Sequence, residues 1–121
     1  IISAGTIMPE ALAAADLLFE SGISAEVVSM HTIKPMDTTY LQQAAGRFKL
    51  LVTVEEHGLI GGLGGAVAEW RSLQNISVPH LSFGTPDEFM HEIGSQEYAR
   101  DKYGLVANNI ASKITERFKS L

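Results

Sequence analysis

The chain has 121 residues and a formal net charge of -5, with 45% apolar and 19% charged residues. This length predicts one domain over residues 1–121 with a full hydrophobic core. The 9 Lys and Arg residues are scattered, which argues against nucleic acid or an anionic membrane as a partner, because both require clustered positive charge. No apolar stretch approaches the roughly 18 residues of a membrane span. Cysteine is absent, which excludes disulfides and is compatible with a cytoplasmic location.

Strand and helix patterns alternate along the whole chain, which predicts an α/β fold in three layers. The sheet should hold four or five mostly parallel strands, with room for one antiparallel edge strand. Residues 1–5 resemble the end of a core strand, so we expect the chain to be a piece of a longer polypeptide that continues on the N-terminal side. The expected elements, in chain order, are strand 1–4, helix 9–21, strand 25–30, helix 38–45, strand 50–55, helix 63–73, strand 76–81, helix 96–103 and a last helix that reaches residue 121.

Local signals fix several of the expected helix ends. Asp37 or Thr38 is expected to cap the second helix, and Gly46 to end it. Gly22 is a left-handed cap for the first helix, and Ser95 precedes the short helix over 96–103. These signals depend only on neighbouring residues, so they define boundaries without any knowledge of the tertiary structure.

The most informative segment follows the apolar run over 50–54 and leads into the helix over 63–73. In an open α/β sheet, ligands and partner domains usually dock where a strand leaves its carboxyl end. The candidate interface or anion-binding residues of this segment are Glu55, Glu56, His57, Gly61, Gly62, Gly64 and Gly65.

The glycines do not match a nucleotide-binding motif. A G-x-G-x-x-G pattern that starts at Gly62 needs glycine or alanine at position 67, which is Val67. A phosphate-binding loop needs Gly-Lys-Ser/Thr, and no Lys lies between Lys49 and Lys102. Glycines before a helix still expose amides that can hold an anion, but tight turning and close packing of the backbone is the favoured explanation.

The polar residues do not form a catalytic site. Glu55 and Glu56 are adjacent in a strand and therefore point to opposite sides. We expect one to complement a helix N-terminus and the other to make an inter-domain hydrogen bond or ion pair. The four His residues, including His57, lack metal-ligand spacing, and G-x-S-x-G is absent. We therefore expect no catalytic, cofactor-binding or metal-binding residue in this chain.

In order along the chain, several segments resemble the C-terminal domain of the transketolase family of thiamine-diphosphate enzymes. The family includes transketolases, deoxyxylulose-phosphate synthases and E1 β subunits, and the likeness is greatest to the split or bacterial transketolase type. The segments that carry the resemblance are Ile2-Ser3-Ala4-Gly5, Glu10-Ala11-Leu12-Ala13-Ala14-Ala15, Gly22-Ile23-Ser24-Ala25, Ile33-Lys34-Pro35-Met36-Asp37, Val52-Thr53-Val54-Glu55-Glu56-His57, Gly61-Gly62-Leu63-Gly64, Ala66-Val67-Ala68-Glu69 and Tyr103-Gly104-Leu105.

The resemblance implies a division of labour and a strand order of 2-1-3-4. In such enzymes two N-terminal domains hold thiamine diphosphate and Mg²⁺, and the C-terminal domain supports packing and dimer assembly. The parent enzyme would transfer a two-carbon ketol unit between sugar phosphates. The partners implied are the N-terminal domains or a subunit of the same enzyme, in a homo-oligomer. A stand-alone module that senses an anion or nucleotide, or that docks a partner, is the alternative.

The chain departs from the family pattern at two places. The segment 81–93 is more apolar and lacks the basic residues that often follow the fourth strand. Val106 stands where many relatives have a capping Ser or Thr, so Asn108 is expected to cap the last helix instead.

Overall fold

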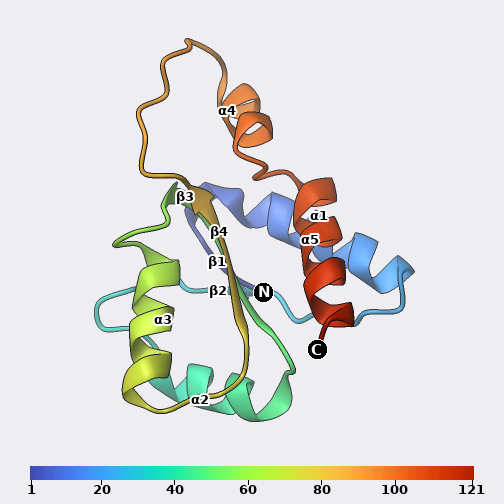
Figure 1. Ribbon diagram of the computed structural model, residues 1–121, viewed down its shortest axis with the longest axis vertical. Coiled ribbons are helices and arrows are strands. Elements are labelled where there is room, and N and C mark those ends of the chain that lie inside the picture. The colour runs from blue at the N-terminus through green and yellow to red at the C-terminus, as the bar shows by residue number, and fades with distance from the viewer.

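The structure is a computed structural model that describes residues 1–121. A four-stranded sheet lies between two layers of helices (Figure 1). Its strands are β1 (Ile2–Ala4), β2 (Val28–Ser29), β3 (Leu51–Gly58) and β4 (His80–Thr85). The helical elements are the 3₁₀ turn η1 (Gly5–Ile7), α1 (Met8–Glu20), α2 (Thr38–Arg47), α3 (Leu63–Leu73), α4 (Gln96–Lys102) and α5 (Ala107–Lys119).

The sheet order is β2-β1-β3-β4, and every neighbouring pair is parallel. The predicted three-layer α/β class and the order 2-1-3-4 are confirmed. The antiparallel edge strand for which the prediction left room is not formed. Because all four strands run the same way, their carboxyl ends meet at one edge, which we call the carboxyl edge of the sheet.

Each face of the sheet has its own buried core, as the alternation of side chains along a strand requires. On one face β3 and β4 pack against α1 and α5, and on the other β1 packs against α2 and α3 (Figure 1). The first core contains Ile7, Ala14, Leu18, Val52, Val54, Phe83, Leu105, Ile110, Ala111 and Ile114. The second contains Ile2, Met30, Leu41, Leu63, Val67 and Trp70.

The predicted bounds of the second, third and fourth strands are wrong, and the fourth ends at Thr85 rather than at residue 81. The fourth strand begins at His80 rather than at residue 76, because Asn75 turns the chain with a left-handed φ of 53° and Ile76 packs into the α2–α3 core. The second strand is only Val28–Ser29, since it is an edge strand that pairs with β1 alone. β3 continues past the predicted residue 55 to Gly58, which pairs with Thr85 beyond an irregularity in the register.

Some of the helix caps predicted from neighbouring residues are confirmed and others are wrong. Asp37 and Ser95 cap α2 and α4 by accepting from backbone amides. Gly46 does not end α2, which continues to Arg47. The predicted Asn108 cap of α5 is also wrong, because the amide of Ala107 donates instead to a carboxylate oxygen of Glu10, on α1, at 2.7 Å.

None of the helices has the length and the apolar character that a membrane crossing requires.

Candidate functional site at the carboxyl edge of the sheet

Glu55 near the end of β3 holds the N-terminus of α3. Its side chain is buried, with 3% of the residue exposed. The amides of Leu63 and Gly64 donate to its two carboxylate oxygens at 2.7 Å and 2.8 Å. Free amides and the positive end of the dipole at a helix N-terminus both favour a carboxylate. The strand therefore supplies the cap that Gly62, at the N-cap position, cannot supply itself.

Glycine is required at position 62 by the approach of this carboxylate. A Cβ at Gly62 would overlap the Glu55 side chain and lie 2.7 Å from Nδ1 of His57. Because two of the amides that begin α3 already bind Glu55, an external anion would have to displace a buried carboxylate. This arrangement supports the packing explanation of the glycines and counts against the anion-sensing alternative.

Glu56 points to the other side of the strand and forms an ion pair within the chain. Arg100 on α4 donates to it from Nε at 2.7 Å and from Nη2 at 2.9 Å. Thr6 and Gln96 also donate to it. The hydrogen bonds from Arg100, more than any other contact, lower the pKa of Glu56 from 4.5 to about 2. Glu55 and Glu56 do reach different partners on opposite sides of the strand, as expected, and within this chain the ion-pair partner of Glu56 is Arg100.

Arg100 joins three segments at the carboxyl edge. Besides pairing with Glu56, its Nη2 donates to the backbone oxygen of Thr6 at 3.0 Å. The side chains of Arg100 and Glu56 are mostly buried, with 13% and 24% of their areas exposed. The ion pair therefore fastens α4 to β3 and to η1, and it positions the loop over residues 86–94 that leads into α4.

His57 and the outer glycines have lesser roles in the structure. His57 is exposed, and its Nδ1 lies 2.9 Å from the backbone oxygen of Gly58. Gly61 has a left-handed φ of 82°, which strains other residues. A Cβ at Gly65 would meet only the Leu59 carbonyl oxygen, at 3.8 Å. No group of three or more His, Cys, Asp or Glu side chains is placed to hold a metal ion.

Gly64 lets α3 approach a small cluster of hydroxyl groups on β3 and β4. A Cβ at Gly64 would lie 3.0 Å from Oγ of Ser82 and 3.1 Å from Oγ1 of Thr53. These two hydroxyls lie 3.2 Å apart, and Nε2 of His80 lies 3.0 Å from that of Thr53. Burial, and secondly the charge of Arg71, lower the pKa of His80 to about 4. His80 is therefore neutral and packs with the two hydroxyls below α3, where this cluster supports the packing of the helix on the sheet.

Residues Thr6, Gln96 and Arg100 complete this edge, and the sequence analysis missed them. They are separated from Glu56 by 50, 40 and 44 positions. No periodicity or motif links such distant positions. Composition offers the one available signal. No Lys or Arg occurs between Arg71 and Arg100, so few cations are available to pair with Glu56, and Arg100 is one of them.

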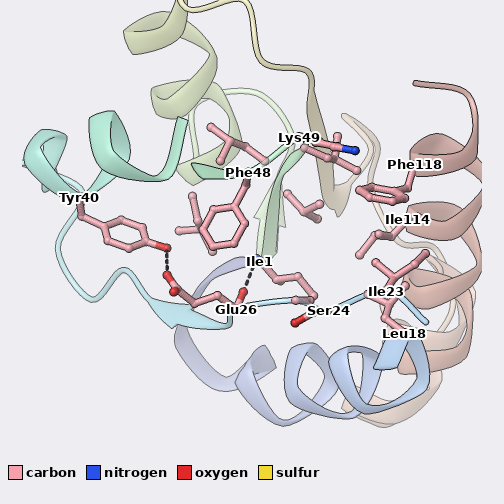
Figure 2. Close-up of a pocket in the computed structure, with 15 residues that line it drawn as sticks. Ile1, Leu18, Ile23, Ser24, Glu26, Tyr40, Phe48, Lys49, Ile114 and Phe118 are labelled. Carbon is pink, nitrogen blue, oxygen red and sulfur yellow. Dashed lines mark hydrogen bonds between the residues drawn. The ribbon is translucent and has the colours of Figure 1, made fainter. Parts of the chain in front are cut away.

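An apolar pocket opens at the opposite edge, where the strands begin (Figure 2). It has a volume of about 60 Å³, and 12 of its 15 lining residues are hydrophobic, including Phe48, Ile114 and Phe118. At its side, Tyr40 donates to the Glu26 carboxylate at 2.8 Å, and the amino group of Ile1 donates to the Glu26 backbone oxygen at 2.6 Å (Figure 2). Cofactor pockets usually span about 300–1,000 Å³, so this one is too small for such a ligand.

The polar groups of the carboxyl edge are thus used in contacts within the chain. Glu55 caps a helix, Glu56 binds Arg100, and the hydroxyls of Thr53 and Ser82 bind each other. A nucleophile, a base and an orienting group do not converge on a common point, as catalysis by side chains would require. The arrangement stabilises the edge and leaves its outer loops as the accessible surface.

Comparison with known proteins identifies the family. The family model described as "Transketolase, C-terminal domain" matches residues 1–110. A transketolase C-terminal section of Methanocaldococcus jannaschii is 42% identical over 119 residues, which are 98% of this chain and 36% of that protein. The 6-deoxy-6-sulfo-D-fructose transketolase subunit of a Clostridium species is 40% identical over 97% of this chain and 37% of its own length.

Two further relatives extend the comparison. The 1-deoxy-D-xylulose-5-phosphate synthase of Vibrio parahaemolyticus is 38% identical over 96% of this chain and 18% of its own length. A solved split-gene transketolase, described as an inactive beta4 tetramer, superposes with a TM-score of 0.86 at 36% identity, over 95% of this chain and 37% of that one. The chain spans about a third or less of the length of these relatives. Both its sequence and its fold show that it belongs to the transketolase C-terminal domain family.

Proposed function

We propose that this chain is the non-catalytic C-terminal section of a transketolase-like enzyme, and that it supports inter-domain packing and dimer assembly. The remaining sections would bind thiamine diphosphate and Mg²⁺ and transfer a two-carbon ketol unit between sugar phosphates in the cytoplasm. The observation that carries the proposal is the use of every charged group at the carboxyl end of β3 in a contact within the chain, Glu55 with α3 and Glu56 with Arg100. These contacts fasten α3 and α4 to β3, and so they give this edge of the sheet a fixed shape.

The relatives support the same division of labour. They are proteins of which this chain spans 18% to 37%, so most of each relative lies outside the matched section. One of them is a subunit, and the solved neighbour is a tetramer. We therefore propose that the partner of this chain is the cofactor-binding section of the same enzyme, on the same polypeptide or on a second subunit, within a homo-oligomer.

Ketol-transfer assays test the proposal directly. This chain alone, supplied with thiamine diphosphate, Mg²⁺ and a pair of sugar phosphates, should show no turnover. The enzyme assembled with its cofactor-binding section should transfer the ketol unit. Turnover by the chain alone would refute the non-catalytic role, and an assembled enzyme that accepts no sugar phosphate would refute the proposed reaction.

A further inference from the structure

The loops that follow β3 and β4 expose a group of large apolar side chains. Ile60 is 76% exposed and Phe89 is 88% exposed, while Ile93 is fully exposed and Leu59 partly so. We call Leu59, Ile60 and Phe89 the carboxyl-edge patch; Ile93 lies further along the loop that carries Phe89. The amide of Leu59 donates to the oxygen of Thr85 at 2.9 Å, which joins the starts of the two loops. Ile60 and Phe89 line one shallow groove between them.

The loop that carries Phe89 is anchored at both ends. The loop over 86–94 projects beyond the sheet and returns through α4 (Figure 1). At its far end Ser95 caps α4, Glu92 pairs with Lys102, and Arg100 fastens α4 to Glu56. Large exposed apolar groups on an ordered framework mark interaction sites more often than isolated surface residues do.

The free charge around the patch is negative. The chain has no Lys or Arg between Arg71 and Arg100. Glu92 has an ion pair with Lys102, but Asp87 and Glu88, beside Phe89, are exposed and have neither an ion pair nor a side-chain hydrogen bond. A partner that covers the patch therefore meets an apolar centre with an acidic rim.

This charge pattern distinguishes between two possible partners. A second copy of the chain, placed face to face on the same patch, would bring Asp87 and Glu88 close to their own equivalents, and like charges across an interface are costly. A partner with Lys and Arg around an apolar centre would instead complement the rim. The relatives contain protein beyond the matched section, which is only 18% to 37% of their length, and that protein is a candidate for this partner.

We propose that the carboxyl-edge patch is the surface that docks the cofactor-binding section of the same enzyme, through an apolar surface rimmed by Lys and Arg. This inference rests on the proposed function and names the contact surface. None of the patch residues belongs to the candidate set over 55–57 and 61–65, although Leu59 and Ile60 lie between those two ranges. The segment supplies the framework, and the flanking loops supply the contact.

Cysteine labelling in the assembled enzyme tests whether the patch is covered. The chain has no native cysteine, so Phe89→Cys introduces one thiol at the centre of the patch. Leu73→Cys is the matched control, because Leu73 is 79% exposed on α3 and lies outside the patch. With a maleimide probe and peptide mass spectrometry, we expect residue 89 to react at least tenfold more slowly than residue 73. Equal rates would overturn the proposal.

Because a cysteine could itself weaken the contact, hydrogen exchange of the unaltered assembled enzyme is the second measurement. The amides of Ile60 and Phe89 should exchange more slowly in the assembled enzyme than the amide of Ser77, which lies in the exposed segment after α3. If the amides of Ile60 and Phe89 both exchange as fast as this exposed reference amide, the proposal is overturned.

Charge reversal distinguishes the cofactor-binding section from a second copy. In the assembled enzyme, Asp87→Lys combined with Glu88→Lys should loosen docking, and the wild-type contact should weaken as salt is raised. The expected change is about a tenfold faster labelling of residue 89, with Asp16→Lys on exposed α1 as the control. Slower labelling would mean that like charges had been relieved, and it would overturn the proposal in favour of a second copy. Ketol transfer is measured separately. If the patch is covered but the assembled enzyme transfers no ketol unit, the proposed reaction is contradicted and the docking surface is not.

Discussion

Replacing Glu55 by Gln removes the charge that holds α3 while it preserves the size and shape of the side chain. In the native structure the carboxylate accepts from the amides of Leu63 and Gly64 at 2.7 Å and 2.8 Å, at a buried position. Gln retains one oxygen for one amide but turns its NH₂ group toward the other, which loses its acceptor. A hydrogen bond to a charged group contributes about 1.5–3 kcal/mol, and a buried unsatisfied donor costs about 1–3 kcal/mol. We therefore expect E55Q to lower the free energy of unfolding by about 2–4 kcal/mol.

Urea unfolding followed by circular dichroism measures this change. The midpoint should fall while the slope of the free energy against urea stays that of the wild type, because the area exposed on unfolding is unchanged. Glu69→Gln is the control, since Glu69 lies on the exposed side of α3, and it should shift the free energy by at most about 0.5 kcal/mol. If E55Q and E69Q lower the stability equally, the carboxylate does not hold the helix and the reasoning fails.

Two further predictions concern the same edge. Gly64→Ala puts a methyl group 3.0 Å from Ser82 Oγ and should destabilise by roughly 1–2 kcal/mol, whereas Gly65→Ala meets only an atom at 3.8 Å and should stabilise α3 by about 0.5–1 kcal/mol. Unfolding midpoints that move in the same direction would contradict this contrast. The hydrogen bonds from Arg100 hold the pKa of Glu56 at about 2 instead of 4.5, so the unfolded chain takes up the proton first. Stability should therefore fall as the pH drops from about 5 toward 2, and Glu56→Gln should flatten that part of the profile; identical profiles would count against the ion pair.

The sequence predicted the parts of this structure that depend on neighbouring residues. Asp37 and Ser95 cap their helices as expected, and Gly22 has the left-handed φ of 78° expected at a helix end. The period of the apolar residues and the alternation of strands and helices established the α/β class. One of Glu55 and Glu56 was expected at a helix N-terminus, because a strand, a glycine turn and a helix follow one another closely, and the structure assigns this role to Glu55.

Contacts between distant positions were not predictable in this way. The ion pair of Glu56 with Arg100 joins residues 44 positions apart, and the cap that Glu10 provides for α5 joins residues 97 positions apart. Asn108 was the local candidate for that cap, and a carboxylate from another helix replaced it. The fourth strand was placed too early because Ile76 is apolar, although it packs into a helical core rather than pairing in the sheet.

The cap that α1 provides for α5 has a consequence for how the chain folds during synthesis. Glu10 leaves the ribosome among the first residues of this segment, but its partner Ala107 and the residues Ile110 and Ile114, which cover the same core as Leu18, emerge among the last. Until α5 emerges, the face of the sheet that α1 and α5 cover together is covered by α1 alone. Domains fold as units during translation, so this one completes that core only when α5 has emerged. Its first helix therefore remains accessible to chaperones for almost the whole synthesis of the segment.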